Sequence, residues 1–189
     1  MGNVEAHELH HNFRPDLSYF TARPDSSYYK TEIEKEDRVV YNALMLALNE
    51  GLADMVDKDI LLTDDSKWWR KDAIQAVYMR EGETVVKKLN KYLAAAASGV
   101  TQNPALYDAL YLNYKGHIPG YFMARAINDN GRLEEVIEHA DNPFIFFLTY
   151  QKVALLDERL PVFDAGVIDY LKNLNAKYLK KPKTKYTGN

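Results

Sequence analysis

The sequence predicts an all-α protein, a compact bundle of about seven helices with an extended N-terminal arm and a basic C-terminal tail. Apolar residues recur every three or four positions over most of residues 31–180. Capping residues, prolines and glycines punctuate this pattern where helices begin and end. No segment alternates apolar and polar residues as a half-buried strand does. We therefore expect one helical domain over 31–180, an arm over 1–30 and a tail over 181–189.

The arm has no helical or alternating period, and it carries Pro15 and Pro24. Positions 7–11 read HELHH, which matches the H-E-x-x-H pattern of zinc peptidases. On a helix this pattern places two imidazoles on one face, with the glutamate as general base. No predicted sheet precedes the motif, and His117 and His139 are distant candidates for a third ligand. We interpret it as part of a solvated arm and expect no metal and no cofactor, with adventitious metal binding and catalysis as the alternatives.

Capping residues and glycines predict where the first helices begin and end. Thr31 and Glu34 form a capping box that starts a helix running to about residue 58. A second helix is expected to begin near Trp68. Gly82 interrupts it before a continuation that stops at Gly99.

The second half of the chain repeats one start signal. Asn followed by Pro at 103–104 and again at 142–143 gives a cap and a preformed first turn. Asp164, after Pro161, caps the last helix. Shorter helices are expected between these, over 119–127 and 133–141. The helix that begins at 143 carries large apolar residues on all of its sides, so we expect it to be central to the core of the fold.

Composition excludes several classes of protein. The chain has 189 residues and no cysteine, which excludes disulfides, a thiolate nucleophile and a cysteine zinc site. No signal sequence and no apolar run of about 20 residues is present, so we expect a protein that is neither secreted nor in a membrane, in the cytoplasm or in a virion. Fourteen tyrosines suit half-buried surfaces, either in a helical core or between subunits.

Charge is unevenly distributed although the net value is only −3. Acidic residues crowd positions 54–65, without the ligand spacing of a calcium loop, so we expect helix caps and a solvated acidic face. The end of the chain carries four lysines that could contact a nucleic-acid backbone: Lys180, Lys181, Lys183 and Lys185. The net charge argues against a general nucleic-acid binder.

The segment QKVALLDERLPVFDAGVIDYL, at 151–171, resembles the later half of the helix-hairpin-helix DNA glycosylase module. The resemblance implies that Lys152 is an amine nucleophile and that Asp164 is its electrostatic or base partner. Phe144–Leu148 stands where that module has a glycine hairpin. The structural interpretation is that Lys152 extends from the edge of a buried helix and that Asp164 is an N-cap.

No phosphate-binding loop and no nucleophile motif is present, so whether the chain is an enzyme is uncertain, and the sequence leans against it. A helical body with polar arms suits a subunit whose arms reach onto its neighbours. The leading hypothesis is a non-enzymatic assembly subunit in a homo-oligomeric ring or multi-protein complex, such as a phage head-to-tail connector that docks on a portal ring. The alternative is a nucleic-acid-binding or glycosylase-like enzyme that uses Lys152 and Asp164.

Overall fold

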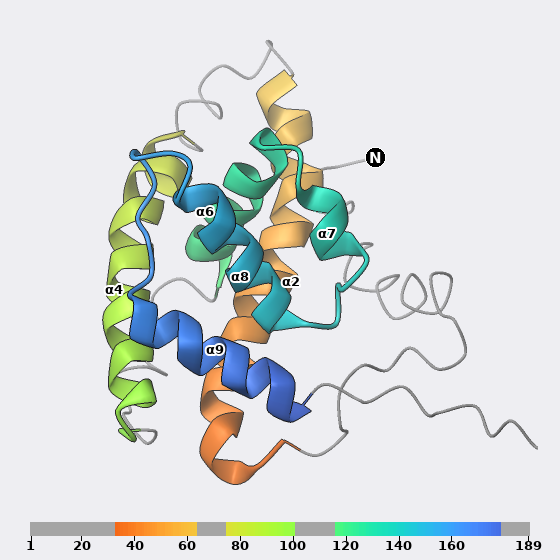
Figure 1. Ribbon diagram of the computed structural model, residues 1–189. Helices are drawn as coiled ribbons and strands as arrows, with labels where there is room; N and C mark the ends of the chain where they lie inside the picture. Colours follow the sequence, from red (N-terminus) through yellow and green to blue (C-terminus); the bar gives the residue numbers. More distant parts are fainter. Residues whose placement is uncertain (1–32, 64–74, 101–115, 179–189) are drawn as a thin grey trace, which may run out of the picture.

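The computed structural model describes residues 33–63, 75–100 and 116–178 (Figure 1). These ranges contain helices and no strand, which confirms the predicted all-α bundle. The elements are α2 (Lys35–Thr63), a π-helical segment η2 (Gln75–Arg80), α4 (Glu81–Ala97), α6 (His117–Asp129), α7 (Leu133–Ile137), α8 (Pro143–Ala154) and α9 (Ala165–Tyr178). Six α-helices are therefore seen where about seven were predicted. The helix expected to begin at Asn103 and Pro104 lies in residues 101–115, outside the described residues.

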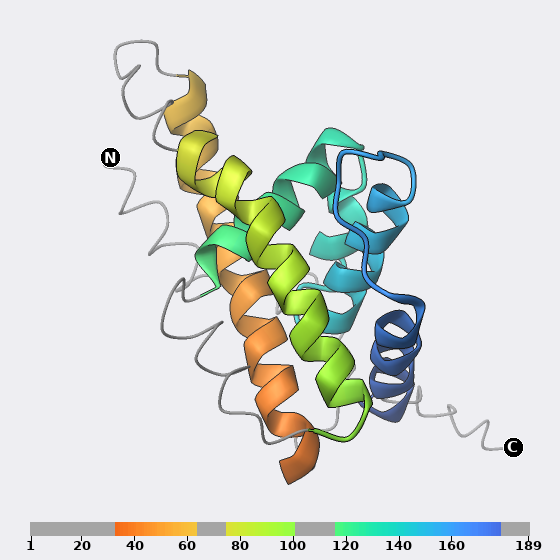
Figure 2. The same ribbon diagram turned by 90° about the vertical axis from the view of Figure 1, so that its left-hand side faces the viewer.

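The helices are arranged around two central ones. In Figure 1, α4 lies at the left and α2 runs through the middle behind α8; α6 packs against α2, α4 and α8, and α8 also packs against α2. The view in Figure 2 shows α9 at the side of α4, and α9 also packs against α8. Both central helices are apolar on most sides, and nine of the 13 residues of α6 are buried.

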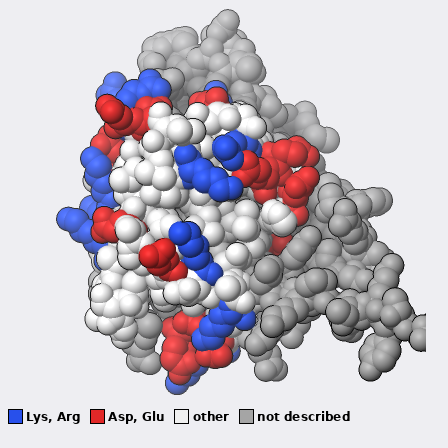
Figure 3. Space-filling view, in the orientation of Figure 1, with Lys and Arg blue, Asp and Glu red and all other residues white. Residues whose placement is uncertain are grey.

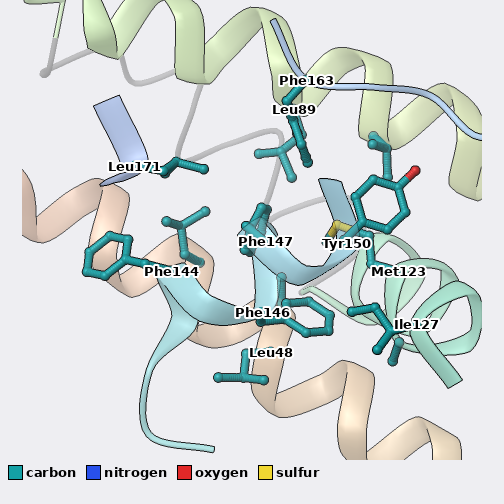
Figure 4. Close-up of a cluster of buried hydrophobic side chains, with 14 of the residues drawn as sticks. Leu48, Leu89, Met123, Ile127, Phe144, Phe146, Phe147, Tyr150, Phe163 and Leu171 are labelled. Carbon is teal, nitrogen blue, oxygen red and sulfur yellow. The ribbon is translucent and has the colours of Figure 1, made fainter. Parts of the chain in front are cut away.

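Helix α8 forms the centre of the core, as the sequence predicted. Its N-cap is Asn142, whose Oδ1 accepts a hydrogen bond of 3.1 Å from the Ile145 amide, and Pro143 follows at the first helical position. Four of its aromatic side chains are fully buried: Phe144, Phe146, Phe147 and Tyr150. Figure 4 shows these rings among Leu48 of α2, Leu89 of α4 and Leu171 of α9.

We expect Phe147→Ala to lower the free energy of unfolding by about 3–5 kcal/mol, because it opens a cavity in a close-packed core. Phe147 is fully buried, and its ring centroid lies 5.8 Å from that of Phe163. Leu156→Ala is the control, since Leu156 is 76% exposed. Urea denaturation measures both changes. An unfolding free energy for Phe147→Ala equal to that of the control would contradict this placement.

Helices α2 and α6 cross with their backbones in contact. A Cβ atom added to Gly51 would lie 2.5 Å from the carbonyl carbon and oxygen of Gly120. One added to Gly120 would lie 2.1 Å from the carbonyl oxygen of Ala47. Just before α6, Gly116 has φ +80°, a conformation that favours glycine, and it lies against the backbone of Leu46. The first turns of α6 are therefore held against the middle of α2.

This crossing predicts that Gly120→Ala destabilises the protein by about 1–3 kcal/mol or more, because the methyl group forces two backbones apart. Gly166→Ala is a matched control near the start of α9, where an added Cβ meets nothing within 4 Å. The control is expected to be neutral or slightly stabilising. Thermal unfolding of the two variants gives the comparison. Equal stability of the two would mean that α2 and α6 are further apart.

Other predictions fall on residues that the structure does not describe. These are the arm over 1–30, the helix start near Trp68 and the tail over 181–189. Within the described ranges, no helix is both long and apolar enough to span a bilayer.

Candidate functional site

Four ionisable side chains gather where α2 and α6 cross. Glu50, Asp54 and Lys58 follow one another at intervals of four residues, so they lie along one face of α2. His117 is the first residue of α6 and is directed toward this face from the turn at Gly116. The glycine contact between the two helices therefore also brings His117 to the carboxylates.

The geometry of this cluster centres on Asp54. Nδ1 of His117 lies 3.2 Å from Oδ1 and 3.1 Å from Oδ2 of Asp54, and 3.4 Å from Oε2 of Glu50. Nζ of Lys58 donates a hydrogen bond of 2.7 Å to Oδ1 of Asp54. The Asp54 side chain is fully buried, whereas those of Glu50 and His117 are 16% and 33% exposed. The cluster thus runs from a buried carboxylate to a partly exposed carboxylate and imidazole.

The charges in this cluster favour a protonated imidazole. The hydrogen bond from His117 to Asp54 raises the pKa of His117 above its ordinary value of 6.5, and the charges of Asp54 and Glu50 add to the effect. Burial and the charge of Lys58 act in the opposite direction. With His117 protonated, the two carboxylates face two cations, and the buried Asp54 charge is compensated.

We expect NMR titration of the metal-free protein to give His117 a pKa above 6.5, and Asp54→Asn to lower it. Since the folded-state pKa is the higher one, His117 contributes its full stability below the unfolded-state pKa. That contribution is lost as the pH rises through the folded-state pKa. Asp169→Asn, at an exposed position of α9, is the control and should leave the pKa unchanged. A wild-type value at or below 6.5 would contradict the geometry.

Lys152 pairs with Glu135 and not with Asp164, the partner that the glycosylase resemblance implies. It lies in the last turn of α8, and its Nζ donates a hydrogen bond of 3.0 Å to Oε2 of Glu135 on α7. This contact holds the pKa of Glu135 below its ordinary value. On the face shown in Figure 3, Lys and Arg side chains are interspersed with Asp and Glu, as expected for a solvated surface.

Asp164 lies immediately before α9, at the position predicted for a cap. Its carbonyl oxygen accepts from the Ile168 amide at 3.0 Å, and its own amide donates to Oδ1 of Asn90 on α4 at 2.9 Å. Among the contacts that the described residues make, none joins Asp164 to Lys152. These contacts therefore do not support the pairing of Lys152 with Asp164 that the glycosylase resemblance implies.

The aspartate-rich segment differs in part from the prediction. Asp54 was expected to cap a helix or to lie on a solvated face, but it is fully buried within α2. Spacing along the sequence does not show its two cationic partners, one of which is 63 residues away. The signal that could have found the site is the four-residue interval between Glu50, Asp54 and Lys58, which places three ionisable groups on one helix face.

A family model described as "Putative zinc dependent peptidase (DUF5700)" matches residues 1–159. The match covers most of the chain, so the protein belongs to this family. No curated protein and no solved structure gives a significant match.

Family membership contradicts the hypothesis of a non-enzymatic assembly subunit, and the phage connector in particular was wrong. That hypothesis gave more weight to the polar arms than to the HELHH motif within them, and the match includes positions 7–11. These positions lie outside the described residues, as do Lys180, Lys181, Lys183 and Lys185. Association with other subunits and contact with nucleic acid remain predictions.

The described residues do not hold a complete metal site. No group of three His, Asp or Glu side chains in the ranges 33–63, 75–100 and 116–178 is arranged to bind an ion. Glu50 and Asp54 each lie within 3.4 Å of Nδ1 of His117, and Lys58 also donates to one oxygen of Asp54. The HELHH motif lies outside these ranges.

Proposed function

We propose that the protein is a zinc-dependent peptidase in which His7, His11 and Glu50 hold the metal. The observation that carries the proposal is the family match over a segment that contains an H-E-x-x-H motif. The motif supplies two imidazoles and a glutamate that acts as general base. Catalytic zinc takes three protein ligands and leaves a fourth position for water or substrate, and two histidines with one glutamate are a known set.

Glu50 fits the third position better than its neighbours do. Both oxygens of Asp54 interact with His117, and one of them also accepts from Lys58. Glu50 lies one turn earlier on the same helix face, with a side chain that is 16% exposed where that of Asp54 is fully buried. A carboxylate at the partly exposed end of the cluster is more accessible to an ion than the fully buried Asp54. Carboxylate and imidazole are also the donors that zinc prefers when no cysteine is available.

The chain's own residues then have distinct roles in hydrolysing a peptide bond. Zinc in this position would polarise the substrate carbonyl and lower the pKa of a water molecule. Glu8 would accept the proton of the attacking water and deliver it to the leaving amine. Asp54 lies against Nδ1 of His117, and this contact would fix the orientation of the imidazole next to Glu50 and the bound substrate.

The test combines zinc content with peptide hydrolysis. The wild-type protein should bind one zinc ion per chain and cleave fluorogenic peptides, with loss of activity on chelation. Glu8→Gln should retain zinc but lose about 100-fold or more of the activity, because it lacks the general base. Glu50→Gln and His7→Ala should lose both zinc and activity, because each removes a proposed metal ligand.

Glu134→Gln is the matched control, because Glu134 is an exposed glutamate on α7. It should keep both zinc and activity. Wild-type protein without zinc, or a Glu8→Gln variant as active as the wild type, would disprove the proposal.

A further inference from the structure

Lys58 is a buried cation in the second half of α2, only 8% exposed. Lysine is rarely buried to this extent unless its charge is compensated. It forms an ion pair with Asp54, one turn earlier, which is the favourable order for an acidic and a basic residue on a helix.

Among the described residues, a carboxylate and an aromatic ring contact the ammonium group of Lys58. Nζ lies 2.7 Å from Oδ1 of Asp54 and 4.7 Å from the centroid of the Tyr78 ring in η2. An aromatic face attracts a cation at this distance, and the attraction is stronger where water is excluded. Lys58 is therefore held between a carboxylate of its own helix and a ring from a different element.

The same Asp54 oxygen also faces His117. Oδ1 lies 2.7 Å from Nζ of Lys58 and 3.2 Å from Nδ1 of His117, and the ring also reaches Oδ2 at 3.1 Å. Because Lys58 holds one oxygen, the plane of the carboxylate is fixed. The orientation of the His117 ring follows from that plane, since both oxygens are directed toward Nδ1.

We propose that Lys58 is a positioning residue of the peptidase site, which orients His117 through Asp54 without touching metal or substrate. This inference rests on the proposed function. Groups behind the residues of a metal site commonly set activity by fixing side-chain orientation, and their loss costs about 10–100-fold. A purely structural ion pair would instead affect stability and leave turnover by the folded protein unchanged.

The experiment compares Lys58→Met, Lys58→Arg and Lys87→Met. Lys87 is the matched control, because it pairs with Glu83 four residues earlier on α4 but is exposed. Lys58→Met should keep its helical circular dichroism and its zinc, while kcat falls about tenfold or more and KM changes by less than about twofold. Lys58→Arg should restore part of the loss, and Lys87→Met should match the wild type. Unchanged kcat in Lys58→Met, or loss of zinc from it, would overturn the proposal.

A second measurement does not depend on activity. In metal-free protein, the Nδ1 proton of His117 should give a downfield, slowly exchanging NMR signal in the wild type and in Lys87→Met. Lys58→Met should broaden or lose this signal, and an unchanged signal would overturn the proposal. If Lys58→Met does not fold, Lys58→Arg provides the comparison, with a shifted signal expected. Wild-type protein that lacks zinc and hydrolysis would refute the proposed function, while this signal would still decide the role of Lys58.

Discussion

The close contact between the backbones of α2 and α6 determines both the packing of the bundle and the geometry of the candidate site. Neither Gly51 nor Gly120 has room for a Cβ atom, because each lies against the main chain of the opposing helix. At this separation, His117 in the first turn of α6 reaches Glu50 and Asp54 on α2. A larger residue at the crossing would move α6 outward and would separate the imidazole from both carboxylates. Packing and site geometry thus have the same cause.

The remaining helices hold α6 in that position. On the side of α4, a Cβ atom added to Gly82 would lie 2.5 Å from the ring of Phe122, so this approach is also close. On the side of α8, the rings of Phe122 and Tyr150 lie 6.4 Å apart between centroids. Tyr150 is tied in turn to the loop before α9, because its hydroxyl donates to the carbonyl oxygen of Pro161 at 2.8 Å. Helix α6 is therefore supported by three helices, which suits an element that carries a site residue.

The sequence predicted the fold class well because helix signals are local. The Asn142 cap and the aromatic residues after it identified α8 and its place in the core. The end of α2 was placed five residues early, at about 58 instead of Thr63. Gly51 lies inside this helix at a cost of about 1 kcal/mol relative to alanine. What offsets that cost is the contact with α6, which no local pattern reveals.

The candidate site was harder to predict because its parts are far apart in the sequence. His117 and Asp54 are 63 positions apart, and only the crossing of two helices brings them together. The HELHH motif was recognised, but its surroundings favoured a solvated arm over a metal site. The family match over residues 1–159 is what favours a role for this motif in binding zinc. The proposed combination of the motif with Glu50 joins residues about 40 positions apart, and no local sequence spacing suggests such a pairing.

Crystallography at the zinc absorption edge shows directly whether Glu50 completes the metal site. We expect one anomalous peak per chain, about 2.0–2.2 Å from a nitrogen of His7, a nitrogen of His11 and a carboxylate oxygen of Glu50. His117 should remain hydrogen-bonded to Asp54 beside this peak. A zinc ion bound by other residues, with the Glu50 carboxylate outside its coordination sphere, would contradict the account.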